Sequence, residues 1–452
     1  MKIDFLIVRP GTDRPVGAIP DLARPMALGL NALGYSPAIL TLEESTLPPP
    51  DVPIFRLRYR EQVTAGLRSD PSAAHAHGVY NFRRFSFCEH EYVQEEVRPR
   101  PHHLLAAEVP AAFGEVTRFF DEHDIGCVVH PVMGAEVIRE TVTYVARARG
   151  IPVMYNSNTR YFSDRTLLVA DTRRTPFVRP HLRFEELPKP RQKYLLDYLE
   201  EKRAARPVER FWLADRSFPA LAAAFIRERK YLEARRLLNG VKRAWQHVEL
   251  QISRFYWRTP RPGDSYVYYP LQYNNESTII VGCPKCFRQE YVLEYVERVL
   301  PEGVKLFFKQ HPHNPAEGAS LRFLRDVLRL KNAQLVPLHQ SSWDLSRNAQ
   351  VVVTIDNTVG YEALLLHKPV VVLGYPAYRG WGVTYDVVDL NDLPRAMDQA
   401  FAGGLTEERL LDFLASFESI HVPGNWFDPP LDPDELASGV QLAFDRLAGR
   451  HV

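Results

Sequence analysis

The sequence has few cysteines, no long hydrophobic run and almost no net charge, and each absence excludes a class of protein. Four cysteines among 452 residues do not make a disulfide framework, which favours a protein of a reducing compartment. No stretch approaches the roughly 20 apolar residues that a membrane-spanning helix needs. A formal charge of +1 gives no global field for nucleic acid. We therefore expect no nucleic-acid partner, and an anionic substrate must be held by local groups.

The apolar run near the N-terminus, Ile3 to Val8, is interrupted by Asp4 and is too short for the core of a signal peptide. It is more typical of a first buried strand. We therefore expect a cytoplasmic protein, either free or peripheral at the inner face of the membrane. With 45% hydrophobic and 25% charged residues, the chain is long enough to form two ordinary globular domains.

Hydrophobic patterns divide the chain into four segments. Strand and helix patterns alternate in the first and third, which is typical of parallel, doubly wound sheets. Between them apolar residues recur at helical spacing with almost no strand signal. We predict an N-terminal Rossmann-like domain, a helical bridge, a C-terminal Rossmann-like domain and a last helix able to pack back on the first domain: 1–187, 188–262, 263–427 and 428–452. This α/β organisation is that of the GT-B architecture.

The predicted elements are mostly short. Residues 45–103 are rich in Pro, Arg and His and are expected mainly as loops, and a helix is expected at 106–123. Strands of the second domain are predicted at 265–272, 304–312, 333–338, 349–355 and 369–374. Its helices are predicted at 289–301, 318–330 and 359–368. In such a sheet, ligands bind at the carboxyl ends of the strands.

The strand predicted at 304–312 ends in the polar sequence Lys309-Gln310-His311-Pro312. Lys309 and His311 can both donate hydrogen bonds to phosphate oxygens, and Pro312 fixes the direction of the chain. A strand-end turn without any ligand would look the same. This segment therefore suggests a phosphate site only in combination with others.

A second polar cluster follows the strand at 349–355: Thr354, Asp356, Asn357 and Thr358. Gly360 then opens a helix, whose free N–H groups and dipole make an anion site. Asn357 or Thr358 could equally serve as the N-cap. Glu362 is expected in the first turn, where its carboxylate could accept both hydroxyls of a ribose.

The third cluster, residues 272–278, contains the carboxylate best placed for catalysis, Glu276. A solvated cap is the alternative interpretation of Glu276. A first-domain residue near His130, which ends a predicted strand, is the second candidate for a base. No Asp-x-Asp motif stands in an obvious strand-end loop, so we expect metal-independent chemistry with no cofactor.

These motifs resemble those of the capsular polysaccharide biosynthesis proteins, the family that includes the β-Kdo transferases. The resemblance lies in Pro270-Leu271-Gln272, Glu276-Ser277-Thr278, Lys309-Gln310-His311-Pro312, Asn357 to Leu364, Lys368-Pro369-Val370, Gly374 and Tyr378 to Gly382. It implies a GT-B glycosyltransferase whose second domain holds a cytidine nucleotide. It also implies that His311, Asn357 and Thr358 contact the phosphate. Gln272 and Asn275 stand where family members often have His and Pro.

The resemblance implies a nucleotide-sugar donor, CMP-linked and carrying Kdo or a related ulosonic acid, and a glycan or glycolipid acceptor. A peripheral association with capsule assembly machinery at the inner membrane fits the same function. A glycerophosphotransferase fed by CDP-glycerol, a sugar-nucleotide epimerase and a non-catalytic capsule assembly or export partner are the alternatives. Cys283 and Cys286 have the spacing of half a zinc site, but no second pair of ligands is evident in the sequence.

Overall fold

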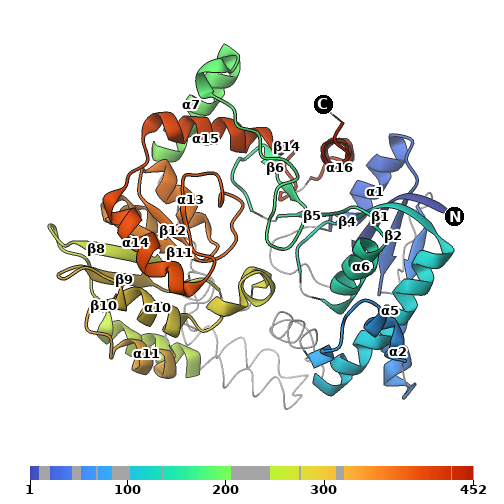
Figure 1. Ribbon diagram of the computed structural model, residues 1–452, viewed down its shortest axis with the longest axis horizontal. Helices are drawn as coiled ribbons and strands as arrows, with labels where there is room; N and C mark the ends of the chain where they lie inside the picture. The colour runs from blue at the N-terminus through green and yellow to red at the C-terminus, as the bar shows by residue number, and fades with distance from the viewer. Residues whose placement is uncertain are drawn as a thin grey trace, which may run out of the picture. The chain divides into compact units, whose positions relative to one another are not determined.

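The computed structural model describes residues 1–9, 21–42, 52–67, 70–83, 102–134, 136–157, 159–204, 245–273, 276–311, 320–428 and 430–450. The chain forms two compact units. Unit 1 comprises Met1–His181, Asn275–Gly282 and Ser416–Val452, and unit 2 comprises Leu182–Asn274 and Cys283–Ala415. Each unit is built around its own six-stranded sheet, as shown in Figure 1.

The sheet of unit 1 has the strand order β3-β2-β1-β4-β5-β7. All neighbouring strands run parallel except β5 and β7, which are antiparallel. The strands are β1 (Lys2–Arg9), β2 (Pro37–Thr41), β3 (Ile54–Arg56), β4 (Asp124–His130), β5 (Val153–Asn156) and β7 (Leu168–Val169). A separate antiparallel pair joins β6 (Arg165–Thr166) to β14 (Val422–Pro423).

The helices of unit 1 come from its first segment, Met1–His181, and from its last segment, Ser416–Val452. They are α1 (Ala23–Ala32), α2 (Tyr59–Thr64), α3 (Ser72–Ala76), α5 (His102–Glu122), α6 (Val137–Ala148) and α16 (Pro433–Leu447). Residues 45–103 were expected mainly as loops, which is wrong for β3, α2 and α3. These elements are only three to six residues long, so hydrophobic periodicity could not reveal them.

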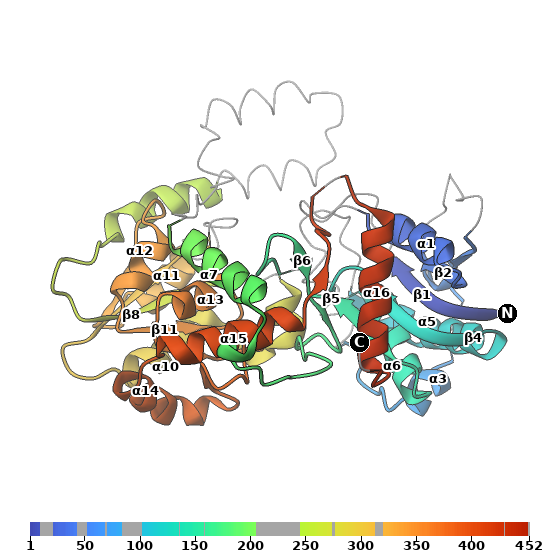
Figure 2. The ribbon, with the colours of Figure 1, turned by 90° about the horizontal axis from the view of Figure 1, so that it is seen from above.

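The last helix, α16, packs against α1, and Figure 2 shows the two side by side. Leu436, Ala437 and Val440 of α16 belong to the same buried cluster as Met26 and Leu30 of α1. A Cβ at Gly29 would meet the backbone carbonyl of Pro433. The glycine therefore permits the close approach of the two helices, and the chain's last helix completes the core of its first domain.

The sheet of unit 2 is parallel throughout and has the order β10-β9-β8-β11-β12-β13. Its strands are β8 (Tyr266–Pro270), β9 (Lys305–Lys309), β10 (Ala333–Leu335), β11 (Val351–Thr354), β12 (Val370–Val372) and β13 (Tyr385–Asp386). The chain runs outward from β8 to β10 and then returns to β11 on the other side of β8. This is the doubly wound order of dinucleotide-binding sheets, so the predicted fold class is confirmed.

The helices of unit 2 are α7 (Lys189–Ala204), α10 (Gln289–Arg298), α11 (Leu321–Val327), α12 (Ser342–Asn348), α13 (Thr358–Leu365), α14 (Leu393–Ala402) and α15 (Glu407–Ser419). Side chains of β8 alternate between the two faces: the Tyr266 hydroxyl donates to Leu345 of α12, and the Tyr269 hydroxyl donates to Gln289 of α10. The described part of the predicted bridge, α7 and a helix at 245–253, belongs to unit 2. The chain passes between the units at 181/182, 274/275, 282/283 and 415/416, whereas the sequence predicted segment boundaries after residues 187, 262 and 427.

No helix within the described residues is both long and apolar enough to cross a membrane.

Candidate functional site

The site in unit 2 lies at the point where the strand order reverses, between β8 and β11. Ligands of open α/β sheets bind outside the carboxyl ends of the strands at such a switch point. Three predicted polar clusters follow strands here: residues 309–311 follow β9, residues 354–358 follow β11, and residues 271–273 follow β8. The fold therefore brings two of the three predicted clusters, and the start of the third, to one sheet edge.

On the β9 side, the sheet continues past its last assigned residues. The backbone N–H of Leu271 donates to the carbonyl of Lys309 over 2.8 Å, and the rings of Tyr273 and His311 stack with centroids 6.1 Å apart. The Lys309 side chain is buried, and its Nζ donates to Ser342 Oγ at 3.1 Å. His311 therefore lies beside the end of β8, and Lys309 is directed toward the start of α12.

On the β11 side, Asn357 links the two central strands. Its Nδ2 donates to the carbonyl of Pro270 at the end of β8 over 3.3 Å, and its Oδ1 accepts from Thr354 Oγ1 over 3.0 Å. Thr354 is fully buried, so its hydroxyl orients Asn357. His311 and Asn357 thus flank the same strand end, separated by two strand spacings of about 4.8 Å each.

The alternative interpretation, N-capping by Asn357 or Thr358, does not hold for Asn357. Asn357 occupies the N-cap position of α13, but its side chain makes no capping hydrogen bond because both of its polar atoms are engaged with β8 and β11. Among the described residues no side chain caps this helix start. Thr358, the first helical residue, is exposed, so the first N–H groups of α13 face an edge with which an anion could interact.

The structure gives a different reason for Gly360 from the one predicted. A Cβ at this position would meet the hydroxyl of Tyr378 and lie 2.7 Å from Thr354 Cγ2. Tyr378 in turn donates to the Asn357 carbonyl over 2.9 Å. The absence of a side chain at Gly360 therefore leaves space for Tyr378, whose hydroxyl donates to the backbone at the start of α13.

Glu362 was expected in the first turn of the helix, and this prediction is wrong. The first turn of α13 contains no acidic residue, and Glu362 is the fifth residue of the helix. It is half-buried and near enough to Tyr198 of α7 for its charge to contribute to that residue's raised pKa, whose largest cause is burial. A ribose role for Glu362 stays a prediction.

Glu276, the predicted catalytic carboxylate, belongs to the segment Asn275–Gly282, which packs as part of unit 1. Its Oε2 accepts from the Thr278 hydroxyl over 3.1 Å, and its backbone carbonyl accepts from Ile279 and Ile280. The backbone carbonyl of Glu276 thus accepts from the short helical turn Thr278–Gly282, and its carboxylate bonds the side chain of the first residue of that turn. Its catalytic role stays a prediction.

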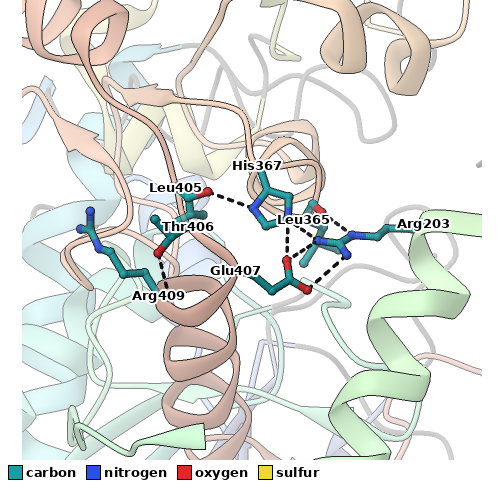
Figure 3. A network of polar contacts seen from close by, with 7 residues as sticks. All are labelled: Arg203, Leu365, His367, Leu405, Thr406, Glu407 and Arg409. Carbon is teal, nitrogen blue, oxygen red and sulfur yellow. Dashed lines mark hydrogen bonds and ion pairs between the residues drawn. The ribbon is translucent and has the colours of Figure 1, made fainter.

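The far end of α13 is held by a polar network (Figure 3). Arg203 at the end of α7 donates through Nε to the Leu365 carbonyl over 2.9 Å and forms an ion pair with Glu407 at 3.1 Å. His367 donates through Nδ1 to the Leu405 carbonyl over 2.9 Å, and its Nε2 lies 2.6 Å from Arg203 Nη2. These contacts attach α13 to α7 and to the start of α15.

His367 has φ of 58°, a left-handed conformation in which glycine is favoured. Its N–H donates to Leu364 and the N–H of Lys368 donates to Ala363, each over 2.9 Å. This pair of bonds is the Schellman arrangement that ends a helix. The histidine side chain, held on both ring nitrogens, accounts for a non-glycine residue at this position.

Cys283 and Cys286 are both buried, with their Sγ atoms 3.2 Å apart. The hydrogen bond between the two thiols lowers the pKa of Cys283 although burial opposes this shift. No group of three or more potential metal ligands occurs within the described residues. The pair therefore has no further ligands there with which to form a zinc site.

In unit 1, His130 ends β4 and is fully buried. Its Nε2 lies 3.0 Å from Thr143 Oγ1, and its ring stacks on Tyr155 with centroids 4.4 Å apart. Burial, helped by the charges of Arg139 and Arg147, lowers its pKa well below the usual value, so the ring is neutral at physiological pH. This arrangement matches a buried core histidine that uses one of its nitrogens.

Sequence comparison finds a family match for the region that contains the unit 2 site. Residues 212–399 match the model of the family described as capsule polysaccharide biosynthesis protein. In this region the chain is similar to the capsule polysaccharide biosynthesis proteins. The matched residues include β8 to β12 and hence every predicted site residue.

Two curated relatives share part of the chain. The lipopolysaccharide-processing protein LpsZ of Rhizobium meliloti is 28% identical over 120 residues, 25% of this chain and 26% of LpsZ. The capsule polysaccharide modification protein LipA of Neisseria meningitidis serogroup B is 25% identical over 148 residues, 32% of this chain and 21% of LipA. The match thus spans about a quarter of the length of these relatives.

Solved structures with a similar course of the chain include KpsC, a β-Kdo 2,7 transferase of Thermosulfurimonas dismutans. It is 17% identical, with a TM-score of 0.34, covering 66% of this chain and 79% of that one. The α,α-trehalose 6-phosphate synthase of Burkholderia multivorans is 11% identical, with a TM-score of 0.35 and 99% coverage of both chains. The fold class given above rests on the strand orders of this chain's own two sheets.

Proposed function

We propose that the chain is a glycosyltransferase of surface-polysaccharide synthesis that takes a sugar from a nucleotide-activated donor. The observation that carries the proposal is the meeting of polar groups from β8, β9 and β11 at the switch point of unit 2. His311 and the uncapped start of α13 flank the end of β8, and both can donate hydrogen bonds to phosphate oxygens. The match of residues 212–399 to the capsule polysaccharide biosynthesis family model supports the polysaccharide part of the proposal.

The proposed donor is a CMP-activated sugar, with Kdo or a related ulosonic acid as the transferred group. This assignment follows the sequence resemblance around Lys309-Gln310-His311-Pro312 and Asn357 to Leu364. The proposed acceptor is a growing glycan or glycolipid, reached from the cytoplasmic side in association with capsule assembly machinery.

In the transfer step, an acceptor hydroxyl oxygen attacks the anomeric carbon and a new C–O bond forms. The bond from that carbon to the donor phosphate breaks, and CMP leaves with the bonding electrons. Lys309, His311 and the start of α13 stabilise the negative charge that develops on the phosphate. The proton of the acceptor hydroxyl goes to a base, for which Glu276 is the first candidate, and the chemistry needs no metal.

A nucleotide panel tests this function. The melting temperature of the full chain is measured with CMP, CDP, UMP, GMP and AMP. A ligand at about 100 times its Kd stabilises the folded protein by roughly 2.7 kcal/mol, and we expect this only from cytidine nucleotides. Equal shifts with every nucleotide, or a shift with UMP alone, contradict the proposed donor. Product analysis then separates a glycosidic bond from a phosphodiester or an epimerised nucleotide sugar.

A further inference from the structure

The side-chain amide of Gln310 is buried and makes no hydrogen bond to the residues that the structure describes. Gln310 follows β9 directly, its exposed fraction is 1%, and neither Oε1 nor Nε2 has a hydrogen-bond partner among the residues that the structure describes. Buried polar side chains are nearly always hydrogen-bonded, so an amide with both ends unsatisfied requires an explanation. Violations of this rule in natural proteins concentrate at functional sites.

A second glutamine in the same unit provides a direct contrast. Gln289, at the start of α10, is 2% exposed, and both ends of its amide are bonded. Its Oε1 accepts from the backbone N–H of Gln272 over 2.8 Å, and its Nε2 donates to the Gln272 carbonyl over 2.7 Å. Gln289 thus fixes the backbone after β8 through hydrogen bonds from both ends of its amide. Gln310 is equally buried, but its amide makes no hydrogen bond to any residue that the structure describes.

The backbone of Gln310 lies at the sheet edge that carries the proposed donor site. The register of β8 and β9 pairs Pro270 with Lys309, so its continuation by one residue sets Gln310 beside Leu271. His311, the next residue, stacks on Tyr273. Because side chains alternate along a strand, Gln310 lies on the face of the sheet opposite to Lys309. Gln310 is thus the sequence neighbour of both Lys309 and His311, and its side chain leaves the backbone on the other face of the sheet from Lys309.

We propose that Gln310 recognises the base of the donor nucleotide by pairing its amide with the Watson–Crick edge of a pyrimidine. This proposal rests on the proposed function, because it assigns a residue to the nucleotide of that donor. An amide offers an acceptor beside a donor, and cytosine presents N4–H beside N3 in the complementary order. The amide is also neutral, so it adds no negative charge next to the donor phosphate.

The test replaces the amide with an apolar group of nearly the same length. Gln310→Met and the matched control Gln289→Met are made in the full chain. Melting temperatures without ligand and calorimetric affinities for cytidine, CMP and ribose 5-phosphate are then measured for each. Gln310→Ala serves as a second variant, which also lacks the amide but leaves a cavity.

We expect Gln310→Met to raise the melting temperature of the free protein, because an unsatisfied buried polar group is removed. The same change should weaken cytidine and CMP about tenfold, a factor that corresponds to about 1.4 kcal/mol, and leave ribose 5-phosphate unaffected. Gln310→Ala should show the same loss of affinity at a lower melting temperature. Gln289→Met should lower the melting temperature, since the backbone groups of Gln272 lose their partners.

Unchanged affinity of Gln310→Met for cytidine overturns the proposal, and so does a lowered melting temperature in that variant. An equal loss of affinity for ribose 5-phosphate also overturns it, because the amide would then contact the ribose or the phosphate. Nucleotide binding by the wild-type protein distinguishes a failure of the Gln310 assignment from a failure of the proposed function. If it binds CMP while Gln310→Met binds it equally well, only the role of Gln310 falls. If it binds no nucleotide, the proposed function falls as well.

Discussion

The two ends of α13 differ in how their backbone groups are satisfied. At the carboxyl end, the Schellman bonds of His367 and Lys368 and the guanidinium of Arg203 engage the last carbonyls. At the amino end, Asn357 directs its side chain to β8 and β11 and leaves the first N–H groups uncapped. At the carboxyl end the last carbonyls are thus engaged by other groups. At the amino end the Gly360 N–H donates to the Asn357 carbonyl, and the Asn357 side chain caps none of the first N–H groups.

This difference predicts which residues around α13 affect the stability of the folded protein and which affect ligand binding. Arg203, His367 and Glu407 fix the helix from the side away from the ligand edge, so their replacement should change the free energy of unfolding. His311 contributes to the edge itself, so its replacement should change affinity. The same division separates Gln289 from Gln310.

The largest effect on stability is expected from Arg203→Ala. The change removes a charged hydrogen bond to the Leu365 carbonyl and the partner of Glu407, which should cost about 2 kcal/mol of unfolding free energy. The matched control is Lys193→Ala on the same helix, which removes an exposed pair with Asp197 and should cost about 0.4 kcal/mol. Urea unfolding measures both. Equal losses in the two variants would mean that the network does not hold α13.

A smaller effect should distinguish two replacements of His367. Both His367→Ala and His367→Gly lose the ring contacts with Leu405 and Arg203. The left-handed conformation at this position is unfavourable for alanine, which has a Cβ, and not for glycine. Glycine should therefore be the more stable variant by about 1 kcal/mol. If alanine proves as stable as glycine in urea unfolding, the positive φ of His367 is not a feature of the folded protein.

The smallest effect concerns pH and Glu407. Burial alone would raise the pKa of this carboxyl, but the hydrogen bond and charge of Arg203, with a contribution from His367, lower it. A folded-state pKa below the unfolded value of about 4.3 contributes stability above that pH, and the contribution disappears as the pH falls through the folded-state pKa. Stability measured from pH 6 to pH 3 should therefore fall less steeply in Glu407→Gln. Identical curves for the two proteins would contradict the ion pair.

Much of the fold could be predicted because its strands are short apolar runs. The β-branched run at Val351–Thr354 and the aromatic run at Tyr266–Pro270 are recognisable from their composition alone. The two-residue strand β13 and the seven-residue helix α12 are too short to show a period. The 13-residue helix α15 carries a readable amphipathic pattern and was missed.

The site was less predictable because its contacts join residues far apart in the sequence. Asn357 is a residue type that favours the N-cap, but its side chain is bonded instead to the Pro270 carbonyl of β8 and the Thr354 hydroxyl of β11. Tyr378 determines the need for glycine at Gly360 in the same way. Gln310 stood within the recognised motif but received no role, because its burial without a partner becomes visible only in the folded chain.

Calorimetric titration of His311→Ala with cytidine and CMP tests the central claim, a phosphate site at the carboxyl edge of unit 2. The variant should fold normally and bind CMP more weakly by about 1.5–3 kcal/mol, the loss expected when one charge-assisted hydrogen bond is removed. Cytidine, which has no phosphate, should bind the variant and the wild-type protein equally. Unchanged CMP affinity in well-folded His311→Ala would contradict the phosphate-binding role and the account built on it.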